Sequence, residues 1–231
     1  MIAQAFHEAL ARLASFDPEV WDAVRVSLSV SGSATLAACA VGIPLGVGVA
    51  LSRFPGKRAV VAGVNTLMSL PTVVIGLVLY ALLSRSGPLG GLELLYTRAA
   101  MAVGQAVLAT PIVAALAIGS LEQVDVRLRQ TAWSLGATAG QARWVVVRES
   151  RGALVAAGMA AFGRVFAEVG VSMMLGGNLR GETRNLATGI AFETGKGEFA
   201  VGLALGFVLL TVALGVNALA ILLKRAREDA P

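Results

Sequence analysis

Four long blocks of the sequence contain no charged residue, and a fifth contains only two. The four charge-free blocks are residues 26–51, 59–84, 99–121 and 199–223. The fifth block, residues 152–179, is interrupted only by Arg164 and Glu168. A helix needs about 20 apolar residues to cross the hydrocarbon layer of a membrane, so each block is long enough to span it. The sequence therefore predicts an all-α integral membrane protein with about five transmembrane helices.

The limits of the apolar blocks divide the chain into spans and connections. The spans are expected at about 22–52, 59–84, 98–121, 152–178 and 199–223. They form one transmembrane domain over 20–223, with a long connecting loop at 122–151. Residues 1–19 place apolar side chains at helical spacing, so we expect an amphipathic helix that lies on the membrane surface. Residues 224–231 form a short basic tail.

The composition agrees with a membrane environment. Apolar residues make up 56% of the chain and charged residues 14%, whereas soluble domains carry about 25% charge. The net charge of +5 gives no reason to expect a nucleic-acid partner, because the cytoplasmic loops of membrane proteins collect Lys and Arg. With one cysteine, Cys39, and one histidine, His7, we expect no disulfide, metal site, cofactor or catalytic residue in this chain.

Residues 24–31 give a conflicting local signal. Apolar and polar side chains alternate there with the period of two that is typical of a β-strand. A single strand leaves its backbone hydrogen bonds unsatisfied in lipid, whereas a helix satisfies them internally. We therefore keep the helix and expect Ser27, Ser29 and Ser31 to face neighbouring helices.

The basic residues predict the orientation of the chain in the membrane. Segments 52–58, 122–151 and 224–231 together carry eleven Lys or Arg, whereas the opposite segments carry seven, mixed with eight acids. Loops rich in Lys and Arg stay in the cytoplasm. We therefore expect the N-terminus outside and the C-terminus in the cytoplasm, which agrees with an odd number of spans.

Glycines and prolines inside the spans predict close packing and bends. Glycine pairs four residues apart let helix backbones approach each other. Such pairs are Gly42/Gly46 and Gly202/Gly206. Pro71 and Pro111 are expected to kink their helices, because proline lacks the amide donor that a helix interior needs. These bends fit ordinary membrane-helix packing, and they also fit a pathway that opens and closes.

The loop at 122–151 has helix-forming residues on both sides of residues 136–140, which predicts two short helices joined by a glycine turn. This loop resembles the cytoplasmic signature of the permease subunits of binding-protein-dependent ABC importers of the type I fold. That signature reads Glu-Ala-Ala, three residues, Gly, nine residues and Ile-x-Leu-Pro. Gln130-Thr131-Ala132 and Gly136 occupy the first part here, while Arg148-Glu149 replaces the Leu-Pro.

The resemblance covers about residues 20–223 and implies how the chain works. The loop is expected to be a cytoplasmic coupling helix that docks on a separate ATPase subunit, which binds and hydrolyses ATP. The expected partners are two copies of that ATPase, an external substrate-binding protein, a second copy of this chain and membrane lipid, in a bacterial or archaeal plasma membrane. The candidate coupling residues are Gln130, Thr131, Ala132, Gly136, Ala137, Gly140 and Arg143.

Arg164 and Glu168 lie four residues apart inside the fifth block. A charge at this depth costs at least ~2.5 kcal/mol, so such residues pair with a partner or face a wet cavity. The sequence allows two arrangements: the two residues form an ion pair with each other, or each has a different partner. Candidates for the translocation pathway and its gate are Pro71, Pro111, Arg164, Glu168 and Gly170.

Residues 162–197 are similar to tungstate importer permeases in particular, through the runs Gly176-Gly177-Asn178 and Arg180-Gly181-Glu182-Thr183-Arg184. The resemblance implies tungstate as the substrate, with molybdate or sulfate as the alternative. Arg180, Arg184 and Lys196 are candidates for guiding the anion on the external side, because a local positive field concentrates anions. Contact with lipid headgroups, or with acids such as Glu182 and Glu193, is the other interpretation of these three cations.

A second functional class remains open from the residues alone. A secondary transporter or channel could use Arg164 and Glu168 as an ion or proton relay. That class predicts flux without an ATPase.

Overall fold

The computed structural model describes residues 6, 7, 11, 14, 15 and 17–228, and the regular elements in that part of the chain are helices. The all-α architecture is therefore confirmed. The helices are α2 (Pro18–Leu51), α3 (Lys57–Met68), α4 (Thr72–Leu83), the 3-10 turn η1 (Gly90–Leu92), α5 (Arg98–Glu122), α6 (Val126–Ser134), α7 (Ala139–Glu149), α8 (Arg151–Phe166), α9 (Gly170–Gly176), α10 (Leu186–Gly195) and α11 (Phe199–Glu228). Most of the amphipathic helix expected at 1–19 and the basic side chains of 224–231 lie outside the described residues, whereas Pro18 and Glu19 already belong to α2.

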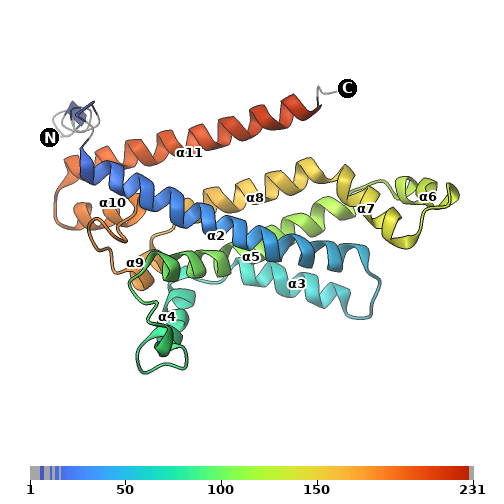
Figure 1. Cartoon of the computed structure of the whole chain (residues 1–231), viewed down its shortest axis with the longest axis horizontal. Coiled ribbons are helices and arrows are strands. Elements are labelled where there is room, and N and C mark those ends of the chain that lie inside the picture. The colour runs from blue at the N-terminus through green and yellow to red at the C-terminus, as the bar shows by residue number, and fades with distance from the viewer. Residues whose placement is uncertain (1–5, 8–10, 12–13, 16, 229–231) are drawn as a thin grey trace.

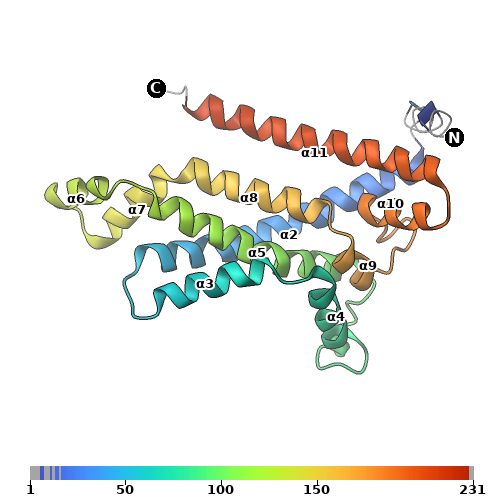
Figure 2. The same ribbon diagram turned by 180° about the vertical axis from the view of Figure 1, so that it is seen from behind.

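Within the described residues, three helices are each long and apolar enough to cross a membrane. They are α2, α5 and the described part of α11 up to Ala218. In Figures 1 and 2, α2, α5 and α8 lie side by side along the long axis of the molecule, with α11 beside α8. The end that holds α6 and α7 also holds the 52–56 loop and the last turns of α11 (Figure 1), and we call it the α6–α7 end. The opposite end holds α10 and the start of α2, and we call it the α10 end.

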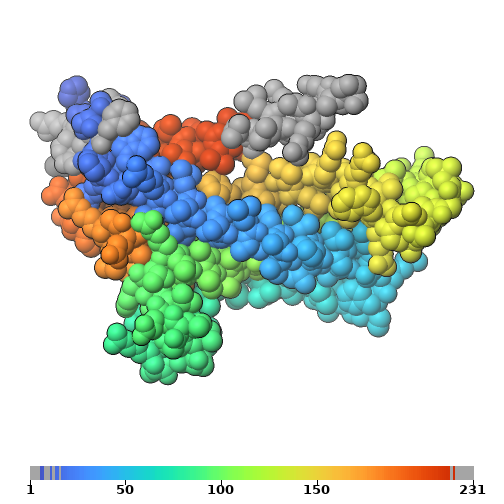
Figure 3. All heavy atoms as spheres, viewed as in Figure 1, coloured from blue at the N-terminus to red at the C-terminus, as the bar shows by residue number. Residues whose placement is uncertain are grey.

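The other two expected spans are bent pairs of helices. The helix axis turns by 91° between α3 and α4 and by 64° between α8 and α9. Counting each pair as one span gives the five crossings expected from the sequence. The first bend follows from Pro71, which holds an extended conformation before α4 and has no amide hydrogen to continue α3. As a result α4 projects sideways from the bundle, and Figure 3 shows this arm as green spheres.

Local capping fixes where the long helices begin. The Asp17 carboxylate accepts a hydrogen bond from the Glu19 amide at 2.9 Å, and Pro18 occupies the first helical position of α2. Proline suits this position because its missing amide would have no partner there in any case. Thr97 caps α5 in the same way through the Ala100 amide.

The serines of α2 do not all behave as expected. Ser27 and Ser31 are buried, and the Ser27 hydroxyl accepts a hydrogen bond from the Leu186 amide of α10 at 2.8 Å. Ser29 is exposed within this chain and bonds back to the Val26 carbonyl instead. The period of two is therefore broken, because side chains on a helix reach one face every three or four residues.

Small residues set the spacing of α2 and α5. A Cβ on Gly42 would lie 2.9 Å from the Thr110 carbonyl oxygen, and a Cβ on Gly46 would lie 2.6 Å from the Ala117 Cβ. Both distances are too short for any larger side chain, so the first glycine pair is a close helix contact. Of the second pair, Gly202 packs against Thr194, whereas a Cβ on Gly206 would meet nothing within 4 Å.

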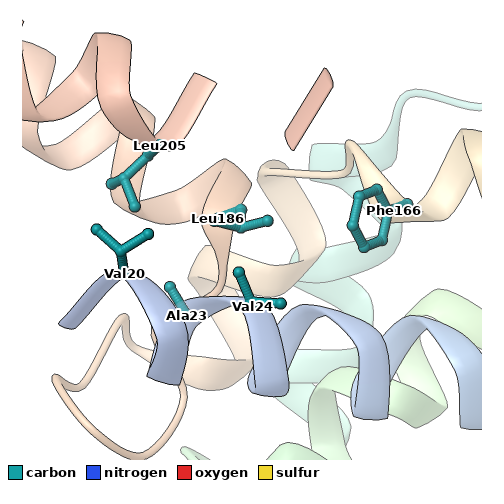
Figure 4. Packing of buried hydrophobic residues seen from close by; sticks show 6 residues of the cluster. All are labelled: Val20, Ala23, Val24, Phe166, Leu186 and Leu205. Carbon is teal, nitrogen blue, oxygen red and sulfur yellow. The ribbon is translucent and has the colours of Figure 1, made fainter. Parts of the chain in front are cut away.

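Apolar contacts join the α10 end of the molecule. A cluster of buried side chains from four helices meets there, as Figure 4 shows: Val20, Ala23, Val24, Phe166, Leu186 and Leu205. This cluster holds the end of α8 between α2 and the α10–α11 pair. It thereby fixes the point at which the chain turns from α8 into α9.

Candidate functional site

The sequence-predicted residues fall in three separate regions of the structure. The coupling candidates lie at the α6–α7 end, Pro71 and the Arg164–Gly170 segment meet where the two bent pairs touch, and the three cations named for anion guidance lie at the α10 end, whereas Pro111 lies apart in α5. Each region is built by a different local device.

At the α6–α7 end, Gly136 ends α6 in a Schellman motif. Its φ of 83° is left-handed, its amide bonds to the Trp133 carbonyl at 2.9 Å, and the Ala137 amide bonds to the Ala132 carbonyl at 3.0 Å. This geometry strongly favours glycine. Two short helices joined by a glycine turn were expected, and both helices are present. The turn is shorter than expected, because Gly140 already lies in α7.

The start of α7 is also encoded locally. Thr138 and Gln141 form a capping box, in which the Thr138 amide donates to Gln141 Oε1 at 2.8 Å and the Gln141 amide donates to Thr138 Oγ1 at 3.4 Å. The helix packs onto the bundle through Ala142 and Val146, which are buried. Its remaining surface is free for contact with another molecule.

The candidate coupling residues lie mostly on that free surface. Gln130, Thr131, Gly136, Gly140 and Arg143 are exposed, and Ala132 and Ala137 are partly buried. Sequence reasoning missed three apolar side chains beside them. Trp133 is 49% exposed, Leu135 82% and Trp144 67%. The sequence signal for them is the presence of large apolar side chains within a charged loop. Exposing such side chains to water is unfavourable, so a group of them marks a contact surface.

The break between α3 and α4 lies against the break between α8 and α9. A Cβ on Gly170 would lie 3.1 Å from the Thr72 hydroxyl and 3.2 Å from a Val73 methyl. One turn further along α4, a Cβ on Gly76 would lie 2.9 Å from the sulfur of Met174. Glycine on each helix therefore lets the two broken spans touch, and we call this contact the junction.

Arg164 and Glu168 pair with each other beside the junction. Arg164 Nη1 donates to Glu168 Oε2 at 2.8 Å. The second carboxylate oxygen accepts from the amides of Gly170 at 3.0 Å and Val171 at 3.4 Å. Glu168 thus caps the first turn of α9, whose amides have no partner inside the helix. Of the two interpretations left open by the sequence, the structure shows the ion pair.

A buried polar contact also ties α9 to the bundle. Gln105 of α5 is fully buried, and its Nε2 donates to the Ser172 hydroxyl at 2.9 Å. Sequence reasoning did not select Gln105, although it is an uncharged polar residue inside an apolar block. Pro111 lies apart from this contact, in the interior of unbroken α5, where its neighbours Thr110 and Val113 face Gly42.

At the α10 end, the three predicted cations are all paired with carboxylates. Arg184 bonds to Glu19 at 2.7 Å and to Glu193 at 3.1 Å, and its side chain is only 11% exposed. Lys196 lies 3.3 Å from Glu193, and Arg180 is paired with Glu19. Pairing with acids was the second interpretation of these residues. Glu193 was among the named acids, whereas Glu19 was not.

The arrangement is a bundle of apolar helices with a polar junction inside and an exposed helical pair at one end. A model of the family described as "Binding-protein-dependent transport system inner membrane component" matches residues 42–228. A probable anion ABC transporter permease protein of Haloferax volcanii is 42% identical over 84% of this chain and 86% of its own length. The tungstate uptake system permease protein TupB of Peptoclostridium acidaminophilum is 38% identical over 94% of this chain and 95% of its own.

The fold gives an independent comparison. A chain of the inward-facing MetNI methionine ABC transporter superposes with a TM-score of 0.72, covering 91% of this chain and 98% of that chain at 22% identity. At this identity the likeness shows the fold alone. Together with the family match over most of the sequence, it identifies the chain as a member of the inner membrane components of binding-protein-dependent transport systems, the permease subunits of ABC importers.

Proposed function

We propose that this permease forms the pathway for tungstate and is driven by a separate ATPase that docks on α6 and α7. The choice of tungstate as the substrate rests on the likeness to the tungstate permease TupB over nearly the whole length of both chains. Molybdate or sulfate is the alternative substrate. A secondary transporter or channel is disfavoured, because the family works with a binding protein.

The proposed orientation puts the α6–α7 end in the cytoplasm and the N-terminus outside. Most Lys and Arg outside the spans belong to the segments at this end. One of them is structural: Lys57 Nζ bonds to the Ala50 carbonyl at 2.7 Å and lies 2.9 Å from a Glu122 carboxylate oxygen. It joins the ends of α2 and α5 at the point where α3 begins.

In this orientation, α6 and α7 face the ATPase. The Schellman turn at Gly136 holds α6 at a fixed angle to α7, and the buried Ala142 and Val146 fix α7 on the bundle. Force applied to the exposed surface is therefore passed to α5 and α8, the helices that flank this pair. Gln130, Thr131, Ala132, Gly136, Ala137, Gly140 and Arg143 remain the proposed coupling residues, to which we add Trp133, Leu135 and Trp144.

The proposed pathway runs beside the junction and is completed by a second copy of the chain, with two ATPases below. Pro71 and Gly170 belong to the junction, the Arg164–Glu168 pair lies beside it, and the proposed motion is a change of angle at the two bends. Pro111 remains a candidate, because a proline inside α5 removes one of the backbone hydrogen bonds of that helix. On the external side we retain Arg180 for anion guidance, because its side chain is 71% exposed, whereas Arg184 and Lys196 are held by Glu193.

Reconstituted complexes test this proposal. The permease, its ATPase and the binding protein are assembled in proteoliposomes, and ATP hydrolysis and anion uptake are measured with tungstate, molybdate or sulfate on the binding protein. We expect tungstate-loaded binding protein to stimulate hydrolysis and uptake. Stimulation only by sulfate-loaded binding protein would contradict tungstate as the substrate. Uptake that needs no ATP would contradict the assignment as an ATP-driven importer.

A further inference from the structure

The two members of the Arg164–Glu168 pair differ in exposure. The Glu168 side chain is 4% exposed, whereas that of Arg164 is 50% exposed. The carboxylate lies on the inner side of the pair, among the amides of Gly170 and Val171. The pair is neutral as a whole, but its positive end points outward. It is therefore an oriented dipole on the surface of the bundle.

The guanidinium has hydrogen-bond donors to spare. Arginine carries five N–H donors in a planar fork. In the described part of the chain, Arg164 makes one hydrogen bond, from Nη1 to Glu168. Its Nε and Nη2 therefore remain available on the exposed side. A planar fork with free N–H groups is the geometry that binds the oxygens of tetrahedral oxyanions.

The position of Arg164 along α8 makes this exposure costly in lipid. Arg164 follows Arg151, at the α6–α7 end of α8, by 13 residues, or about 20 Å of helix. The hydrocarbon layer is about 30 Å thick, so the guanidinium lies within it. The other four apolar blocks contain no charge. A half-exposed guanidinium at this depth has to face water or a polar ligand, because lipid offers it no acceptor.

We infer that Arg164 is the intramembrane contact for the transported oxyanion, and that Glu168 is the positioning residue that holds the guanidinium in place. This inference rests on the proposed function. Oxyanion oxygens accept hydrogen bonds from Nε and Nη2 while Nη1 stays on Glu168. Because the carboxylate cancels the net charge, the anion is attracted but not trapped. A pathway requires such weak binding, since a tightly held anion would stop transport.

The junction keeps the pair at one place. Glu168 is bound by two amides of α9, and Gly170 packs against Thr72 of α4. The guanidinium is thereby attached to the contact between the two broken spans. Movement of α4 against α9 therefore moves the anion contact together with the junction.

Cysteine labelling tests whether Arg164 faces water. Replacing the single cysteine, Cys39→Ser, gives a background in which Arg164→Cys carries the only thiol. We expect a negatively charged methanethiosulfonate to modify this thiol in the assembled complex. Val165→Cys is the matched control, because Val165 is the next residue and is fully buried. Equal, slow labelling at both positions would contradict a wet surface and overturn the inference.

Uptake measurements separate the contact from the fold. We expect Arg164→Met to lower tungstate uptake per inserted complex at least about tenfold. Arg164→Lys should keep more uptake than Arg164→Met, because the charge remains although the fork is lost. Wild-type uptake by Arg164→Met would overturn the inference. Absence of tungstate uptake by the wild-type complex would instead overturn the proposed function.

Glu168→Gln tests the positioning role. The amide oxygen still accepts the hydrogen bonds that start α9, so the fold is preserved while the compensating charge is lost. We expect slower uptake together with at least about threefold more tungstate retained on the purified complex, because an uncompensated guanidinium binds the dianion more tightly. A merely structural role predicts no increase in retained tungstate. Loss of both uptake and retention would overturn this role.

Discussion

Gly170 at the start of α9 lies against Thr72 at the start of α4, so that a Cβ on Gly170 would come within 3.1 Å of the Thr72 hydroxyl. The two residues are far apart in the sequence, and each begins the second half of a broken span. Their contact brings the Pro71 bend and the Arg164–Glu168 pair to one place. A bulkier side chain at either position would separate the halves that the bends bring together.

Gly170→Val should therefore destabilise the permease by about 1–3 kcal/mol, because overpacking forces neighbouring atoms apart. The unfolding temperature of the detergent-purified complex measures this effect. Gly163→Ala on α8 is the control, since a Cβ there would meet nothing within 4 Å. A loss from Gly163→Ala equal to that from Gly170→Val would contradict close packing at the junction.

Gly136→Asp should lower uptake at least about tenfold, equivalent to about 1.4 kcal/mol in activation free energy, while the protein remains in the membrane. We expect the loss because the new side chain would disturb docking of the proposed ATPase. A Cβ at Gly136 meets nothing within 4 Å in this chain, so the side chain would extend from the proposed docking surface. Uptake per inserted protein is the measurement.

Gly197→Asp is the matched control for this variant. Gly197 has a similar left-handed φ of 86° and equally open surroundings, but it lies beyond α10. Backbone strain is then the same in both variants. Normal uptake by Gly136→Asp, or equal loss in both variants, would count against the coupling role.

Leu135→Ser should weaken binding of the ATPase. Leu135 is 82% exposed beside the Gly136 turn, and burying a leucine in an interface contributes about 1.5–3 kcal/mol. We expect at least about a tenfold higher dissociation constant in a titration of the purified permease with the ATPase. Leu92→Ser is the control, because Leu92 is 59% exposed but lies in η1 on the projecting arm. Unchanged ATPase affinity of Leu135→Ser would remove this residue from the docking surface.

Arg184→Met should cost about 1–3 kcal/mol of stability, because Glu19 and Glu193 lose their shared, mostly buried partner and keep only the more exposed Arg180 and Lys196. Arg180→Met should cost at most about 1 kcal/mol, since that side chain is 71% exposed. Thermal unfolding of both variants measures the difference. Similar stability of the two would show that the ion pairs at the α10 end do not hold α2 to α10.

Several features of the fold could be predicted because their signal is local. The charge-free blocks predict α5 and the end of α2 nearly to the residue, since a membrane helix is set by its own hydropathy, whereas α2 begins at Pro18, four residues before the expected span. Gly136 was identified by a turn that needs glycine. Ser29 is exposed instead of facing a neighbouring helix of this chain, because side chains on a helix share a face every three or four residues and not every two.

The breaks at residues 69–71 and 167–169 were harder to find. Hydropathy continues through both, so length alone suggested unbroken spans, and only Pro71 gave a local sign of a bend. Glu19 as the partner of Arg180 and Arg184 had no local sign either, since 161 and 165 residues separate the partners. Ion pairs of this kind depend on how helices are placed in space.

The apolar blocks and the Gly136 loop thus belong to what the sequence by itself determined: an all-helical membrane protein whose exposed loop resembles the signature of the ABC importer permeases. Only the tertiary structure decided that Arg164 pairs with Glu168, that the acid is buried while the base faces outward, and that both lie where two broken spans meet. The physical reason is the range of each effect. Hydropathy, capping and glycine turns act within a few residues, whereas burial and pairing depend on contacts between helices that are distant in the chain.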